Sequence, residues 1–231
     1  MTSVSSGSLL PPDILRLIAS MKDLSIADII HLCKSNQQAN NAICNNKPFW
    51  VALTQHRWQL DLSREEISQI KMDLYFREQA LKYLTDDFEV ARHASRADMR
   101  RALYSLRIGR EEFINNLNTR NITTSPLADI RHYLTIGFIK GVRDLIQDPR
   151  INIRTYNYIL SIVAQTNPQL LHDVLEDPRY TPVVAFNLME RAQLENNQDV
   201  IDILFTYPPA GRMWQPPNWP GEDWRLPYAE E

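Results

Sequence analysis

Residue types that build cofactor and metal sites are scarce in this chain of 231 residues. It has two cysteines, Cys33 and Cys44, and no second pair of cysteine or histidine at the spacing of a zinc site. Among its six glycines no two are spaced as Gly-x-Gly, which excludes the usual dinucleotide fingerprint and the phosphate loop. The five histidines are scattered along the chain. We therefore expect no cofactor and no metal.

Long apolar runs are also lacking. None approaches the ~20 residues of a membrane span, so no span is predicted. The opening stretch from Met1 to Ser8 has neither the basic nor the apolar region of a signal peptide. Both cysteines lie among apolar residues, where we expect them to be reduced and packed, as intracellular proteins allow. The sequence thus predicts a soluble, cytoplasmic protein.

Charge of one sign does not dominate, because 25 basic and 28 acidic residues give a net charge of −3. This balance argues against binding to nucleic acid through overall charge. The segment 92–110 differs, since it holds six arginines and one acidic residue. A candidate basic patch comprises Arg92, Arg96, Arg100 and Arg107. The first three recur every four residues and share a face if their helix is continuous. We favour a solvated or protein-contacting face over a nucleic-acid site, because the only interleaved aromatic residue is Tyr104.

Helical periodicity is what the sequence has in abundance. One apolar stripe at helical spacing comprises Ile26, Ile29, Ile30 and Cys33, and Ser25 with Asp28 predicts its N-terminal cap. A second capping pattern, Ser63 to Glu66, precedes a seam of Ile67, Ile70, Leu74, Leu81 and Leu84. No segment alternates convincingly with period two. The predicted fold class is all-α.

From residue 96 the apolar pattern repeats every 29 residues. The stripe Tyr156, Ile159, Leu160 and Val163 recurs as Ala185, Leu188, Met189 and Ala192, and occurs earlier as Leu127, Ile130, Arg131 and Leu134. The following helix keeps step as Val142, Leu145, Ile146, then Leu171, Val174, Leu175, then Val200, Ile203, Leu204. The turn Asp148-Pro149-Arg150 recurs as Asp177-Pro178-Arg179. A weaker upstream copy comprises Met99, Ala102, Leu103, Leu106, Phe113 and Leu117. Such self-similarity predicts a stack of about four helix pairs.

This repeat resembles the degenerate ankyrin repeats of large DNA viruses, in which a leucine-rich helix and an Asp-Pro-Arg turn commonly end each unit. The resemblance covers 96–207. The Thr-Pro-Leu-His opening of ankyrin units is absent and the period is short. The resemblance therefore implies helix pairs joined by abbreviated loops.

The N-terminal stretch resembles an F-box. Its pattern is Leu10-Pro11-Pro12-Asp13-Ile14-Leu15, then Ile18, Leu24, Ile29 and Leu32-Cys33, closing with Phe49-Trp50 and Leu53. The resemblance implies contact with a Skp-type adaptor of cullin–RING ubiquitin ligases through Leu10, Pro11, Ile14, Leu15 and Ile18. It also implies that Ile29, Leu32 and Trp50 pack the core of the motif. The alternative is a helical cap that shields the end of the repeat stack.

The end of the sequence has a different composition. Six of the 14 prolines and three of the five tryptophans follow residue 207, which predicts an extended tail over 208–231. Trp214, Trp219 and Trp224 either fold back on the last repeat or anchor into a partner. Tryptophans on a stiff chain favour anchoring, because little entropy is lost when they dock.

Adjacent carboxylates provide no catalytic signal. Glu111-Glu112 and Asp86-Asp87 lie near predicted helix starts, where acidic residues stabilise the helix dipole. No catalytic constellation is visible, so we expect a protein that is not an enzyme.

These patterns predict five parts. They are a flexible N-terminus (1–9), an F-box-like head (10–58), connecting helices (59–95), ankyrin-like repeats (96–207) and a Pro/Trp-rich extended tail (208–231). The first functional hypothesis is an adaptor that links a target held by the repeats to a ubiquitin ligase. The second is a structural protein of a large DNA virus, a minor capsid or virion-associated cement protein whose repeats and tail bridge neighbouring subunits. Expected partners are proteins, in the host cytoplasm or the virus particle, and nucleic acid is not expected.

Overall fold

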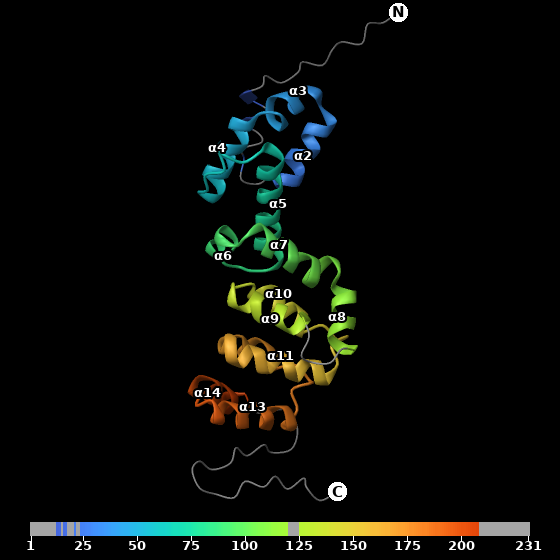
Figure 1. Cartoon of the computed structure of the whole chain (residues 1–231), viewed down its shortest axis with the longest axis vertical. Helices are drawn as coiled ribbons and strands as arrows, with labels where there is room; N and C mark the ends of the chain where they lie inside the picture. Colours follow the sequence, from blue (N-terminus) through green and yellow to red (C-terminus); the bar gives the residue numbers. More distant parts are fainter. Residues whose placement is uncertain (1–12, 15, 18–20, 22–23, 120–124, 208–231) are drawn as a thin grey trace, which may run out of the picture. The chain divides into compact units, whose positions relative to one another are not determined.

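All regular structure in the described part of the chain is helical. The computed structural model describes residues 13–14, 16–17, 21, 24–119 and 125–207. These residues form helices and contain no strand (Figure 1), which confirms the all-α prediction. The chain divides into two compact units. The first runs to Gly109 and includes 136–141, and the second comprises 110–135 and the chain from 142 onward. The predicted flexible N-terminus (1–9) and tail (208–231) lie outside the described residues.

The first unit is built from short helices. They are α2 (Ile26–Ser35), α3 (Gln37–Ala39), the π-helical turn η1 (Asn40–Cys44), α4 (Lys47–Trp58), α5 (Ile67–Tyr83), α6 (Phe88–His93), α7 (Arg96–Leu103) and the π-helical turn η2 (Tyr104–Ile108). Helix α2 begins as predicted, because Ser25 and Asp28 cap each other's backbone N–H groups. The predicted start at Ser63 is wrong. The Ser63 N–H donates to the Asp61 carboxylate within a turn, and α5 starts only at Ile67.

The head packs around two side chains that the F-box resemblance placed in its core. Ile29 and Trp50 are fully buried, while Leu32 is half-buried. Lys71 lies over the Trp50 ring, with 5.3 Å from its Nζ to the ring centroid. Burial lowers the pKa of that ammonium group. Helix α5 also reaches α2 directly, because the Glu78 carboxylate accepts the Ile26 N–H at 2.8 Å.

The two cysteines are joined, so the prediction that they are reduced is wrong. Cys33 on α2 and Cys44 at the end of η1 form a disulfide, with their Cα atoms 6.0 Å apart. Both are buried, as predicted. The expectation of free thiols rested on composition. The turn from α2 through α3 into η1 returns the chain to α2 and brings residues 11 apart in sequence within disulfide range.

Reduction of this disulfide is expected to lower the free energy of unfolding of the head by up to about 3 kcal/mol, because it frees a short closed loop in the unfolded chain. Protein purified without reductant and unfolded in iodoacetamide should gain no alkyl group by intact-mass measurement, and two after reduction. Two alkyl groups without reduction would contradict the bond. Equal unfolding midpoints with and without reductant would contradict its stabilising role.

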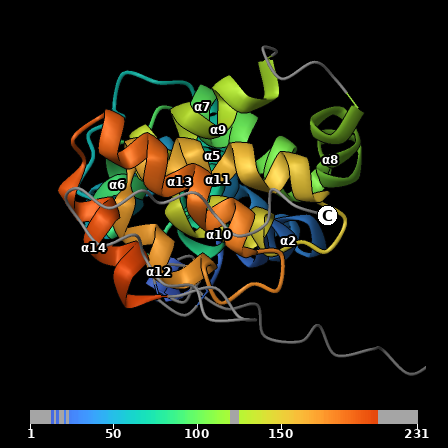
Figure 2. The same ribbon diagram turned by 90° about the horizontal axis from the view of Figure 1, so that it is seen from below.

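The second unit carries the repeats. Its helices are α8 (Arg110–Thr119), α9 (Ser125–Thr135), α10 (Ile139–Ile146), α11 (Ile153–Thr166), the 3-10 turn η3 (Pro168–Leu170), α12 (Leu171–Val174), α13 (Pro182–Leu194) and α14 (Gln198–Thr206). The opening residues of α10 are counted with the first unit. The first helices of successive pairs, α9, α11 and α13, pack side by side and lie one behind another in Figure 2.

The predicted 29-residue pattern corresponds to the buried faces of these helices. Of the 21 predicted apolar-stripe positions between 127 and 204, all are buried except Leu127, which is half-buried, and Arg131, which is exposed. Asn152 and Thr181, 29 residues apart, cap α11 and α13 in the same way. Within this unit α11 packs on η3 and α12, and α13 packs on α14. The weaker upstream copy is buried too, but α7 packs on α5 in the first unit, whereas α8 packs on α9 in the second.

None of the helices within the described ranges combines the length and apolar character needed to cross a membrane.

Candidate protein-interaction surfaces

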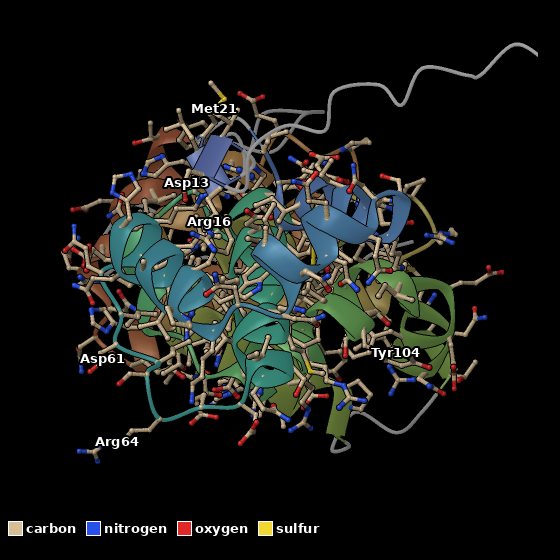
Figure 3. The ribbon with its side chains drawn as sticks, turned by 90° about the horizontal axis from the view of Figure 1, so that it is seen from above. Asp13, Arg16, Met21, Asp61, Arg64 and Tyr104 are labelled. Atoms are coloured by element: carbon tan, nitrogen blue, oxygen red, sulfur yellow. A yellow bond between two sulfur atoms is a disulfide. The ribbon has the colours of Figure 1, made fainter. Side chains whose placement is uncertain are left out.

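The described part of the predicted adaptor contact exposes large apolar side chains. Ile14 is 41% exposed, and Leu17 and Met21 nearby are 62% and 56% exposed. Leu10, Pro11, Leu15 and Ile18 of the predicted contact lie outside the described residues. We call Ile14, Leu17 and Met21 the head ridge. Figure 3 shows Met21 at the outer edge of the head.

Two arginines fasten the segment that carries the head ridge. Arg16 pairs with Asp13 at 3.1 Å, and its Nε donates to the carbonyl of Ala42 at 3.2 Å (Figure 3). Arg57 of α4 donates to the carbonyl of Met21 at 2.6 Å. The same guanidinium pairs with Glu78 of α5 at 3.1 Å, where burial raises the pKa of the carboxyl group and its hydrogen bonds oppose that rise. Arg16 and Met21 are thus each attached to the helices that follow them in the first unit.

The predicted basic patch does not form one helical face. Helix α6 ends at His93 and α7 begins at Arg96, so the helix that was to align these arginines is interrupted. Arg92 pairs with Glu89 at 2.6 Å and donates to Gln59 at 3.1 Å. Arg96 lies half-buried at the start of α7. The structure brings together only Arg100 and Arg107.

Arg100 and Arg107 line a groove of about 670 Å³ within the first unit. Its walls come from α5, α7 and η2, and we call it the α5–η2 groove. The lining residues are Tyr75, Phe76, Gln79, Tyr83, Ala97, Arg100, Arg101, Leu103, Tyr104, Ser105, Arg107 and Ile108. Sequence reasoning missed the aromatic residues of α5. A signal was present, because Tyr75 and Tyr83 are two helical turns apart on one face.

In the second unit, the turn Asp177-Pro178-Arg179 holds neighbouring repeats together. Arg179 forms a two-pronged contact with the Asp177 carboxylate, with its Nε at 2.8 Å and its Nη2 at 2.6 Å. Its guanidinium lies 4.7 Å from the centroid of the Tyr156 ring. It also donates to three carbonyls of the preceding repeat, those of Ile146 (2.6 Å), Asp148 (2.9 Å) and Ile151 (2.8 Å). We call this arrangement the Arg179 clasp. It neutralises the C-terminal end of α10, where unpaired carbonyls concentrate negative potential.

The earlier copy of the turn is built differently. Arg150 binds the Asp148 carboxylate at 2.8 to 2.9 Å, yet its side chain is 50% exposed. Arg110 of α8 supplies a second cation to Asp148, at 2.8 Å. The hydrogen bonds from Arg150, with the charge of Arg110, hold the pKa of Asp148 well below its usual range.

A polar groove of about 840 Å³ crosses the ends of the first helices of the repeats. Arg131 of α9 donates to the amide oxygen of Gln165 on α11 at 3.0 Å. Gln165 in turn donates to the Glu195 carboxylate, next to α13, at 2.7 Å. Hydrogen bonds from Arg191 and Gln165 lower the pKa of Glu195. We call Arg131, Gln165 and Glu195 the repeat ladder.

The remaining candidate residues from the sequence lie at helix starts or outside the described residues. Glu111 and Glu112 lie in the first turn of α8, and Asp87 caps α6, as their predicted places at helix starts imply. In the described ranges no three residues among His, Cys, Asp and Glu are grouped so that they could hold a metal ion. The tail anchors Trp214, Trp219 and Trp224 lie outside the described residues.

Comparison of the chain with protein-family models, with curated proteins and with solved structures yields no match.

Proposed function

We propose that the chain is a non-enzymatic protein–protein interaction protein. Its F-box-like head docks on a Skp-type adaptor of a cullin–RING ubiquitin ligase, and its repeats hold a target. The observation that carries the adaptor proposal is the head ridge. Ile14, at a predicted contact position, is exposed together with Leu17 and Met21, while Ile29 and Trp50 of the predicted core are buried.

The attachment of the head ridge supports docking rather than incidental exposure. A fixed group of large apolar side chains loses little conformational entropy when a partner covers it. Arg16 and Arg57 supply this fixation through the carbonyls of Ala42 and Met21. Large apolar side chains exposed to solvent are candidates for contact with a protein partner.

The repeats support the second half of the proposal. Their ladder of Arg131, Gln165 and Glu195 presents polar groups from three successive helix pairs along one groove. Stacked repeats commonly bind partners on such an extended surface. The ladder suits a target that supplies complementary polar groups.

The adaptor proposal predicts a one-to-one complex with a purified Skp-type adaptor in size-exclusion chromatography with light scattering. Ile14→Ala combined with Leu17→Ala should weaken the complex at least about tenfold, because anchoring side chains dominate such interfaces. Val183→Ala combined with Leu194→Ala is the matched control. It removes side chains that are 65% and 79% exposed in the second unit and should leave binding unchanged.

Failure of the folded wild-type protein to bind the adaptor would overturn the adaptor proposal, as would equal binding by the head-ridge variant. The alternative would then be the structural role in a virus particle. That role predicts loss of assembly on deletion of 210–231, the segment that holds Trp214, Trp219 and Trp224.

A further inference from the structure

We infer that the α5–η2 groove binds an acidic peptide segment of a partner protein, anchored by an apolar or aromatic side chain. Its lining residues include none of the head ridge and none of the repeat ladder. The inference therefore does not depend on adaptor binding.

Charge complementarity identifies the polar part of the occupant. Three arginines line the groove, and none of its lining residues is a carboxylate. Arg100 is exposed, and the Arg107 guanidinium lies over the ring of Tyr83. Guanidinium groups bind carboxylates through two parallel hydrogen bonds, and so favour aspartate and glutamate side chains. This is a local excess of positive charge in a chain whose net charge is −3.

The apolar part of the groove indicates an anchor. Tyr75 is 39% exposed, Tyr104 57% and Ile108 78%, so a partner would remove substantial apolar surface from water. Tyr104 and Ile108 both come from η2, the π-helical turn, in which the Gly109 N–H donates to the Tyr104 carbonyl at 2.6 Å. Such turns are frequent at functional sites.

Gly109 is what allows the Tyr104 ring to lie against this turn. A Cβ at position 109 would stand 3.0 Å from Cε1 of Tyr104, closer than an ordinary contact. The Tyr104 ring thus lies close against the backbone of the turn and forms part of the apolar wall of the groove.

One aromatic ring of the groove, that of Tyr83, is not open to a base of a single-stranded nucleic acid. Base stacking needs open ring faces. The Arg107 guanidinium lies 3.6 Å from the centroid of the Tyr83 ring, and Lys82 Nζ lies 5.0 Å from the same centroid. These two cations also lower the pKa of the Tyr83 hydroxyl. The groove thus offers cations and an apolar wall, a combination suited to a carboxylate-bearing peptide.

The test uses the full chain and a fluorescein-labelled octapeptide of alternating glutamate and leucine with one central tryptophan, followed by fluorescence anisotropy. Arg100→Gln with Arg107→Gln should weaken binding at least about tenfold. The matched control is Arg64→Gln with Arg96→Gln, which removes the same charge outside the groove lining and should bind like wild type. Tyr104→Ala should also weaken binding, as should a peptide with glutamine in place of glutamate.

Several outcomes would overturn the inference. The first is that the wild-type chain does not bind the peptide, and the second is that both arginine variants weaken peptide binding equally. The third is that the chain binds a labelled eight-residue oligothymidylate more tightly than the peptide. The groove variant should keep its complex with the Skp-type adaptor and its thermal unfolding midpoint. Failure of the wild-type chain to bind the adaptor would leave the peptide result standing, so the two proposals fail separately.

Discussion

Replacement of Arg179 by methionine is expected to lower the free energy of unfolding of the second unit by about 3 to 5 kcal/mol. The Arg179 side chain is 18% exposed and that of Asp177 is 11% exposed, so the variant leaves a largely buried carboxylate without its cation. Methionine keeps much of the side-chain length and lacks every donor. The cost arises from groups that lose their partners, rather than from lost volume.

The carbonyls that lose Arg179 add to this cost. Ile146 ends α10, and Asp148 and Ile151 belong to the turn that follows it. Their oxygens are satisfied by a side chain that lies one repeat further along the chain. The variant is therefore expected to loosen the contact between successive repeats and to increase hydrogen exchange in α10–α11 and α13.

Arg150→Met supplies the control within the same motif. Its half-exposed side chain is expected to contribute only about 0 to 1 kcal/mol, and Arg110 still pairs with Asp148 in its absence. Urea unfolding followed by far-ultraviolet circular dichroism measures both variants. Equal losses of stability in the two variants would contradict the structural difference between the turns.

The pH dependence gives the Arg179 prediction a second readout. Hydrogen bonds from Arg179, above all, lower the pKa of Asp177 in the folded chain. A carboxyl group with a lowered folded pKa stabilises the fold at pH values above its unfolded pKa, and this contribution is lost as the pH falls through the folded value. The stability difference between wild type and Arg179→Met should therefore be largest near neutral pH and shrink below about pH 4. A difference that does not change with pH would exclude the carboxylate contribution.

Local periodicity was sufficient to predict the helices and their buried faces. The 29-residue repeat was found because each helix buries one face, and that face leaves an apolar stripe in the sequence. The caps on α2 and the buried positions of the repeat helices followed for the same reason. The unequal roles of Arg150 and Arg179 did not follow. The two triplets have the same sequence but different neighbours: Arg179 donates to the carbonyl of Ile146, whereas Asp148 of the earlier triplet pairs with Arg110 as well.

The α5–η2 groove, too, depends on packing between helices that are separate in the sequence. Its arginines were visible in sequence, but the aromatic residues opposite them belong to α5, and only packing of α5 on α7 brings them together. The helix is interrupted at Ala94 and Ser95, between Arg92 and Arg100, although neither position is a proline or a glycine. The disulfide was missed for a related reason, since it depends on how the chain turns between Cys33 and Cys44.

Arg77→Met is expected to have an effect of similar size in the first unit, about 3 to 5 kcal/mol. Arg77 and Asp73 form an ion pair on α5 at 2.6 Å, with side chains 9% and 11% exposed. Arg77 also donates to carbonyls at the C-terminal end of α6, those of Ala91 (2.9 Å), Arg92 and Ala94 (3.4 Å). One side chain thus partners a buried acid and attaches α6 to α5.

A double-mutant cycle separates these two roles. Asp73→Leu in the Arg77→Met background removes the unpaired carboxylate. The double variant should therefore lose less free energy of unfolding than the two single variants lose together, by roughly 1 to 3 kcal/mol. The remaining loss reports the carbonyls of α6. Unfolding can be followed by tryptophan fluorescence, because Trp58 stacks on Phe88 of α6 with ring centroids 5.0 Å apart. Additive losses would contradict the ion pair. A double variant as stable as wild type would show that the α6 carbonyls find other partners, and that α5 does not depend on Arg77 to hold α6.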